Sequence, residues 1–274
     1  MKRALFMVAT ILSPVPLNAQ DDCFPARGSN EAATFAILAV PLAFGRGGMP
    51  SAEGWSAGLE LAVLPRIPDA TATPTTCRPG KGPENTDLLP VLPRPRVGIP
   101  LPGRFHLEAS WVPPLRVRGV KANLLGLALQ RSVELGSRAL SVRIHTTLGV
   151  VHAPITCNED ALNDPASECL DGTLSDDSYR PNVFGIDAAT EWRRGTSLRP
   201  YAGLGYNHLR PRFQVNFTNS AGDTDRRKVS VDLDRIVLFG GTTWDARPGL
   251  SVGSEVYLSP QDAFTLRVVA RHRM

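Results

Sequence analysis

Alternation of apolar and polar side chains is the feature that most limits what this chain can fold into. In residues 140–151, LSVRIHTTLGVV, apolar side chains recur at every second position, while Arg143 and His145 fall between them. Successive side chains of a β-strand point to opposite faces, so this stretch predicts a strand with one apolar and one charged face. In a soluble sandwich the apolar face would lie in the core. In a membrane barrel it would contact lipid, and the charges would lie in the lumen.

The N-terminus has the layout of a secretory signal peptide. Lys2 and Arg3 open the chain, an apolar run follows, and the small-residue sequence Leu-Asn-Ala ends at position 19. We therefore expect residues 1–19 to be a signal peptide that is removed, and residues 20–33 to form a periplasmic N-terminal segment. Loss of the two basic residues lowers the formal net charge from +4 to +2, which is too small to indicate a nucleic acid as partner.

The four cysteines predict two disulfides. An even number of cysteines in an exported chain favours disulfides over a metal site. Cys157 and Cys169 bracket one loop and are expected to pair, which leaves Cys23 with Cys77. The closely spaced Cys or His pairs of a zinc site are not found in the sequence, so neither a metal nor another cofactor is expected.

Period-two alternation recurs along the chain, and helical periodicity is nearly absent. Ten strands are expected, although a count of twelve is also open. They cover residues 34–44, 54–66, 104–114, 121–134, 138–151, 182–193, 198–218, 227–245, 248–258 and 262–272. The first of these, 34–44, lacks alternation and could instead be a plug. Residues 94–101 would then take its place in the sheet.

The choice between these two N-terminal strands also decides where Cys77 lies. If 34–44 is a strand, Cys77 lies on the periplasmic side with Cys23, and the two can bond. If 94–101 replaces it, Cys77 lies outside and a bond to Cys23 is excluded by distance. We favour the first version, so the expected barrel domain covers residues 34–274.

Three patterns favour a membrane barrel over a secreted or periplasmic β-sandwich. Short and long connections alternate after residue 115, as in outer-membrane barrels. Glycines on the polar faces fit a crowded lumen, and aromatic residues near strand ends fit girdles at the lipid interface. These aromatic residues are Trp55, Trp111, Tyr179, Trp192, Tyr201, Tyr206, Trp244 and Tyr257. We therefore predict an all-β fold, a transmembrane antiparallel up-and-down β-barrel.

A family resemblance rests on the strand rhythm and on two segments, VGIPLPGRFHLEASWVPPL at 97–115 and RPYAGLGYNH at 199–208. In these features the chain resembles bacterial outer-membrane β-barrel proteins of an uncharacterised family. The resemblance covers roughly residues 30–274. It implies a monomer in the cell outer membrane, surrounded by outer-membrane lipid and inserted by the barrel-assembly machinery. The chain departs from the pattern at its end, because residues 271–274 contain no aromatic residue.

The polar strand faces carry acids and bases together. The residues expected to face the lumen are Glu60, His106, Glu108, Arg143, His145, Asp187, Glu191, Glu255, Arg267 and Arg271. In a ten-stranded barrel they would pair across a small lumen, which predicts a structural barrel or a narrow solute pore. A surface-binding barrel that uses its long loops is the alternative from a different class.

Evidence for an enzyme in the sequence is weak. Asp232 and Asp234 lie two apart on one arm of the expected long hairpin and His208 on the other, so they could activate water in a protease-like rim hydrolase. Such aspartates are more often only solvated, so we expect no enzyme. The acidic loop 157–177 is expected to be solvated, and GRGG at 45–48 lacks the strand-to-helix setting of a phosphate loop.

Overall fold

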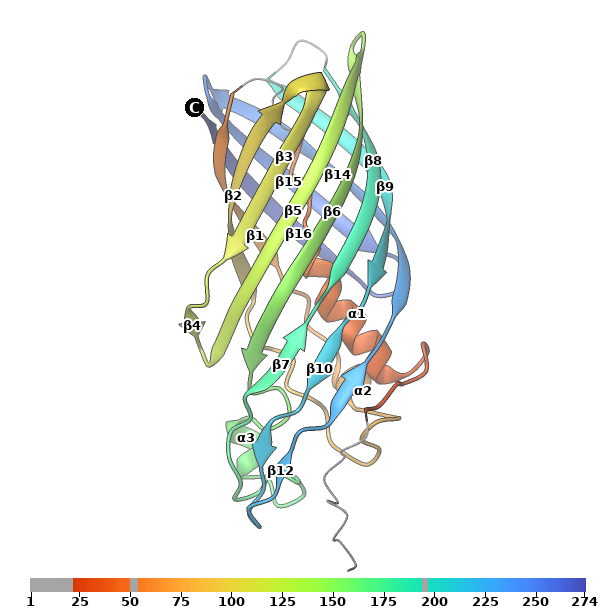
Figure 1. The fold of residues 1–274 in the computed structure, drawn as a ribbon, viewed down its shortest axis with the longest axis vertical. Helices are drawn as coiled ribbons and strands as arrows, with labels where there is room; N and C mark the ends of the chain where they lie inside the picture. Colours follow the sequence, from red (N-terminus) through yellow and green to blue (C-terminus); the bar gives the residue numbers. More distant parts are fainter. Residues whose placement is uncertain (1–21, 50–53, 194–196) are drawn as a thin grey trace, which may run out of the picture.

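In the computed structural model, which describes residues 22–49, 54–193 and 197–274, ten antiparallel strands form a closed barrel (Figure 1). The barrel strands are β1 Ser56–Val63, β2 Val91–Leu101, β3 Phe105–Val112, β5 Val120–Leu135, β6 Arg138–Ala153, β8 Val183–Trp192, β9 Leu198–Leu209, β14 Leu233–Arg247, β15 Leu250–Ser259 and β16 Ala263–Arg273. Strand β1 pairs with β2 on one side and with β16 on the other, which closes the sheet. The predicted up-and-down barrel is confirmed.

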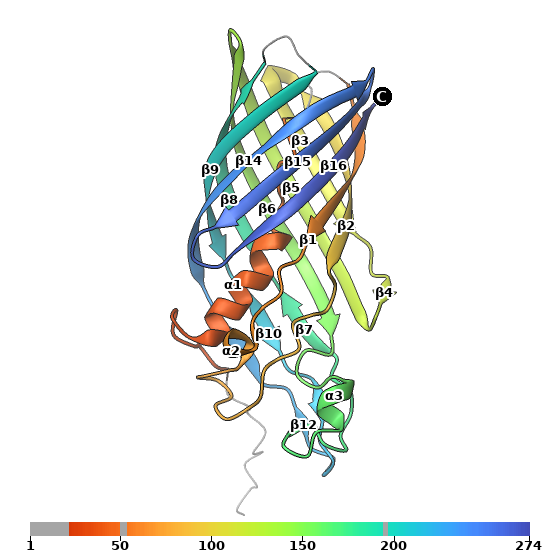
Figure 2. The same ribbon diagram turned by 180° about the vertical axis from the view of Figure 1, so that it is seen from behind.

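The two ends of the barrel carry connections of different length. Few residues join β2 to β3, β5 to β6 and β14 to β15, at the end where the C-terminus lies (Figures 1 and 2). The long connections 64–90, 154–182 and 210–232 gather at the opposite end, together with residues 22–29. We call these four segments the cap.

Short elements fill the cap and the connections. The helices are α1 Asn30–Leu42, α2 Asp69–Ala72, α3 Glu159–Leu162 and the 3-10 turn η1 Pro102–Arg104, and the short strands are β4 Arg116–Val117, β7 Asp177–Arg180, β10 Arg212–Gln214, β11 Phe217–Thr218, β12 Thr224–Asp225 and β13 Lys228–Ser230. Strand β7 pairs with the last residues of β6, and β10 and β13 extend this sheet beyond the barrel. The arms expected at 198–218 and 227–245 are therefore interrupted, since β9 and β14 pair only as far as Leu209 and Leu233.

The outer wall of the barrel is an apolar belt. Large apolar side chains that are exposed on it include Leu59, Leu61, Leu127, Val142, Ile144, Ile186, Leu204, Leu238, Val256 and Leu266. Exposed Trp55 and Trp244 come at or beside the short-turn ends of β1 and β14, and exposed Trp111 and Tyr206 lie near the cap-side ends of β3 and β9. An apolar belt between aromatic residues is typical of a barrel whose wall contacts lipid. Among the described residues, no helix is long and apolar enough to cross a membrane.

Three of the aromatic residues expected at the lipid interface lie inside instead. Tyr179, Tyr201 and Tyr257 are at most 2% exposed. Each has a polar partner for its hydroxyl group, which a buried tyrosine requires. The hydroxyl of Tyr201, for example, donates to the Glu255 carboxylate at 3.0 Å.

Residues 34–44 do not form a strand, which corrects the favoured N-terminal version. They belong mostly to α1, whose N-terminus is capped by the Ser29 hydroxyl accepting from the Ala32 N–H at 3.2 Å. The helix is apolar nearly all round, as expected of a buried helix, and it lies in the cap-side mouth of the barrel (Figure 2). Residues 43–49 continue through the lumen toward the short-turn end. Residues 94–101 take the vacant place as part of β2.

Both predicted disulfides are confirmed. The Cα atoms of Cys23 and Cys77 are 5.8 Å apart, and those of Cys157 and Cys169 are 5.6 Å apart. The prediction that Cys23 cannot reach Cys77 when 94–101 is a strand is wrong. Because the N-terminal segment passes through the lumen, Cys23 lies in the cap together with Cys77.

Candidate functional site

The lumen contains a buried network of charged side chains. The ten residues expected there are all at most 7% exposed: Glu60, His106, Glu108, Arg143, His145, Asp187, Glu191, Glu255, Arg267 and Arg271. Arg94 and Arg96 of β2, at 1% and 3% exposed, join them. Charges this deep are tolerated only when they are paired and hydrogen-bonded.

One part of the network joins β1, β2, β3 and β16. The Arg96 guanidinium donates to the Glu60 carboxylate at 2.6 Å and to the Glu108 carboxylate at 3.0 Å. Glu108 also accepts from Arg271 at 3.2 Å. Two carboxylates and two guanidinium groups therefore alternate across four neighbouring strands.

The other part is centred on Asp187. Its carboxylate accepts from Arg143 at 2.8 Å and from Arg46, and it lies 3.5 Å from the His145 ring. Arg46 comes from the N-terminal segment in the lumen, 141 positions away in the sequence. At the short-turn end, Glu191 accepts from Arg193 at 2.8 Å.

Arginines of the wall also hold the backbone of the lumen segment, residues 43–49. The guanidinium groups donate as follows: Arg94 to the Ala43 carbonyl at 3.4 Å, Arg267 to Ala43 at 3.0 Å, Arg143 to Phe44 at 2.8 Å, Arg96 to Gly45 at 3.0 Å and Arg271 to Gly47 at 2.9 Å. A buried backbone carbonyl outside regular structure needs such a donor. The arginines therefore supply this segment with the hydrogen-bond donors that strand pairing supplies elsewhere in the barrel.

The glycines of GRGG allow this segment to pass. A Cβ on Gly45 would overlap the Arg267 guanidinium and lie 2.7 Å from the Glu255 carboxylate. Gly47 has φ +58° and Gly48 has φ +103°, a region that glycine adopts at least cost. The motif set aside as a phosphate loop thus fits the chain into a narrow lumen.

Sequence reasoning missed Arg46, Arg94 and Arg96. A signal for two of them is present in residues 92–96, LPRPR, where prolines alternate with arginines as the faces of a strand do. No local signal marks Arg46, because its partners lie on strands far along the chain.

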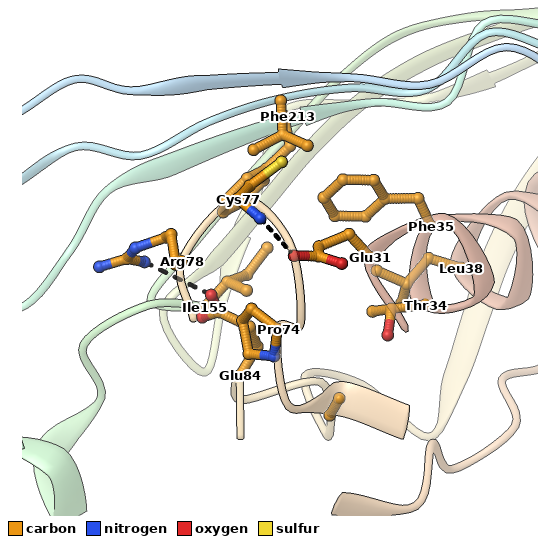
Figure 3. Close-up of a pocket in the computed structure, with 12 residues that line it drawn as sticks. Glu31, Thr34, Phe35, Leu38, Pro74, Cys77, Arg78, Glu84, Ile155 and Phe213 are labelled. Carbon is orange, nitrogen blue, oxygen red and sulfur yellow. Dashed lines mark hydrogen bonds and ion pairs between the residues drawn. The ribbon is translucent and has the colours of Figure 1, made fainter. Parts of the chain in front are cut away.

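Arg78 connects three segments of the cap. This side chain is 5% exposed and lies 3.4 Å from the Glu84 carboxylate, as drawn in Figure 3, and it also pairs with Glu168 and Asp225. These partners belong to the connections 64–90, 154–182 and 210–232, respectively. Burial raises the pKa of Glu84, although Lys81 and Arg78 oppose the shift.

The acidic loop 157–177 is only partly solvated. Asp177 is fully buried and accepts from the backbone N–H groups of Thr156 at 2.6 Å and Asn216 at 2.8 Å, and from the Ser175 hydroxyl at 2.8 Å. In the described part of the chain, no group of three His, Cys, Asp or Glu residues is arranged to hold a metal ion.

Glu31 links α1 to the cap. Its carboxylate, on the first turn of α1, accepts from the backbone N–H group of Cys77 at 2.7 Å (Figure 3) and from that of Thr76, also at 2.7 Å. Burial alone would raise the pKa of Glu31, but these hydrogen bonds hold it below its ordinary value of 4.5.

We expect this contact to be lost in acid. A carboxyl group whose pKa is lowered by folding stabilises the fold above its unfolded pKa, and this contribution disappears as the pH falls through the folded pKa. Hydrogen exchange at Thr76 and Cys77, corrected for the intrinsic pH dependence, should show less protection well below pH 4.5 than at pH 7. Glu31→Gln should abolish most of this difference; an equal difference in the variant would contradict the assignment.

Of the three residues of the enzyme hypothesis, His208 and Asp234 lie on the barrel wall beside the cap, and Asp232 lies in the cap. Nδ1 of His208 is 2.8 Å from the Asp234 carboxylate, which also accepts from the Tyr206 hydroxyl at 2.6 Å. Asp232 instead accepts from Arg212 at 2.7 Å. The fold thus brings His208 to Asp234 but gives Asp232 another partner.

Comparison with known proteins yields only distant structural similarity. No protein-family model and no curated protein matches the sequence. Solved structures similar to the chain include Ail, the attachment invasion locus protein of Yersinia pestis (10% identity, TM-score 0.35, 81% of this chain and 99% of Ail), and Omp33 of Acinetobacter baumannii (8%, 0.30, 81% and 98%). Neisserial surface protein A is also similar (8%, 0.29, 81% and 98%). Similarity this low carries no argument about function.

The location of the protein follows from its own architecture. A closed antiparallel barrel with an apolar outer belt and a polar lumen suits the bacterial outer membrane. The chain is an outer-membrane barrel.

Proposed function

We propose that the protein is a closed outer-membrane barrel that displays its cap for binding, and is not a solute pore. The observation that carries this proposal is the occupation of the lumen by the chain's own residues 43–49. Phe44 and Arg46 of this segment are 0% and 1% exposed, and five wall arginines hold its backbone. This favours the surface-binding alternative over the narrow pore.

The cap is assigned to the cell exterior. Outer-membrane barrels have short turns on the periplasmic side and long loops outside, and the cap contains the long connections. On this assignment residues 22–33 also lie at the exterior, which revises our expectation of a periplasmic N-terminal segment.

Rigidity of the cap supports a binding role. The Cys23–Cys77 disulfide and the Arg78 contacts fix its segments to one another, and the Cys157–Cys169 disulfide closes a loop within one of them. A surface that is already ordered loses less conformational entropy when a partner binds.

Planar-bilayer recording tests the closed lumen. The purified, folded full-length protein should insert without producing a steady ohmic current. Protein whose folded state is verified by heat-modifiable gel migration must be used, because an unfolded sample would also be silent. A steady current from folded protein would overturn the proposal in favour of the pore.

A further inference from the structure

The barrel wall is incomplete beside the cap, between β2 and β5. Pairing of β1 with β2 extends to Val63 opposite Val91. Pairing of β2 with β3 reaches only from Leu101 to Arg96, opposite Ser110. Residues 91–95 of β2 therefore pair on one side only.

Two prolines explain where the pairing stops. The Leu64 N–H donates to the Pro90 carbonyl at 3.0 Å, so every second residue from Pro90 directs its backbone groups toward β1. Pro93 and Pro95 fall between these positions, and their missing N–H groups face the β3 side. A proline cannot donate there, which confines it to a strand edge. Beyond β3 the chain swings outward to β4 (Figure 1).

An apolar pocket of about 60 Å³ lies behind this gap. Its walls come from α1, the β1–β2 connection and the inner faces of β2 and β5, with Val151 of β6, Ile155 and Tyr179 on the far side. Among the described lining residues none belongs to β3. Typical lining residues are Leu38, Leu42, Leu88, Leu92, Ala122 and Leu124. The pocket is smaller than the ~150 Å³ cavity that holds a benzene ring, so it suits the end of one flexible chain.

The rim of the gap combines apolar and basic side chains. Trp111, Leu115 and Val117 are 52%, 69% and 52% exposed and continue the lipid-facing belt toward the pocket. Arg116, Arg118 and Lys121 are exposed in the β4–β5 hairpin. Of these, Arg116 pairs with Asp176 at 3.7 Å, so the hairpin keeps a positive balance.

We propose that the pocket binds the end of an acyl chain of an anionic, phosphate-bearing membrane lipid. The chain enters from the outer leaflet between β2 and β5, and the phosphate lies against Arg118 and Lys121. Because the rim is continuous with the lipid-facing belt, an acyl chain of a surrounding lipid can reach the pocket. The basic hairpin favours an anionic headgroup. This inference rests on the proposed outward orientation of the cap and gives its binding role a ligand class.

Native mass spectrometry of the detergent-solubilised full chain tests the site. Phosphatidylglycerol and phosphatidylcholine with identical chains are titrated against the protein. We expect the first one or two phosphatidylglycerol molecules to bind roughly tenfold more tightly than phosphatidylcholine. Ala122→Phe, which fills the pocket, should weaken phosphatidylglycerol binding by roughly tenfold, the effect of withdrawing about two methylene groups from an apolar site.

Further variants distinguish the contribution of the lipid's acyl chain from that of its headgroup. Arg118→Ala with Lys121→Ala should lower phosphatidylglycerol binding to the level of phosphatidylcholine. Arg138→Ala, at the exposed short-turn end of β6, removes a charge far from the pocket and should change neither. If Ala122→Phe does not fold by heat-modifiable migration, Ala122→Leu replaces it.

Two results would overturn the proposal. One is unchanged phosphatidylglycerol binding in folded Ala122→Phe and in the Arg118/Lys121 variant. The other is competition by millimolar glycerol phosphate, which would indicate a site for soluble phosphate compounds. Neither result depends on ion conductance, so failure here is distinguishable from failure of the closed-barrel proposal.

Discussion

Deleting residues 20–49 is expected to convert a silent barrel into a conducting one. The deletion removes α1 and the lumen segment, and with them the Phe44 and Arg46 side chains that fill the space between opposite walls. A second change, Cys77→Ser, avoids a free thiol in the cap. Planar-bilayer recording of the refolded variant should then show steady ohmic current, since a polar inner wall admits water and ions once the segment is gone.

A matched variant keeps the segment and removes only its covalent tie. Cys23→Ser with Cys77→Ser should remain non-conducting, because the arginine hydrogen bonds to residues 42–47 persist. A folded deletion variant that stays silent would show that side chains of the wall close the lumen by themselves. Equal current from both variants would show that the disulfide alone holds the barrel shut.

Replacing Asp187 by alanine should cause the largest loss of stability among single lumen variants. Its carboxylate accepts hydrogen bonds from Arg46 and Arg143, and all three residues are at most 3% exposed. Removing one member of a buried ion pair leaves uncompensated charge and costs about 3–5 kcal/mol. We expect a loss of that size in denaturant unfolding of the protein in micelles.

Two further variants make the Asp187 result specific. Asp187→Asn keeps the shape and one acceptor, so it should fall between the wild type and Asp187→Ala. Asp232→Ala removes an exposed ion pair with Arg212 and should cost no more than about 1 kcal/mol. Equal losses for Asp187→Ala and Asp232→Ala would contradict the assigned network.

The barrel was predictable from the sequence where alternation is local. Residues 140–151 alternate cleanly and lie within β6, since lipid on one side and a polar lumen on the other impose a period of two. Residues 34–44 are apolar without a period, and such a run does not distinguish a buried helix from a buried strand. Only the enclosing barrel decides that it is a helix.

The N-terminal strand was harder to predict because of its prolines. Proline is rare within strands, and the prolines of residues 92–96, LPRPR, lie here at an unpaired edge. Arg46 shows the other limit of sequence reasoning. Its contact with Asp187 arises only when the chain turns back through its own barrel.

The central claim is that the N-terminal segment runs through the lumen from the exterior. Surface labelling of intact cells tests this claim most directly. An epitope is inserted before Cys23, and in a control chain the same epitope is inserted between Pro248 and Gly249 in the β14–β15 turn. The account predicts antibody binding to the first epitope on intact cells, and to the control only after the outer membrane is permeabilised. An N-terminal epitope that is reached only after permeabilisation, in protein with an intact Cys23–Cys77 bond, would contradict it.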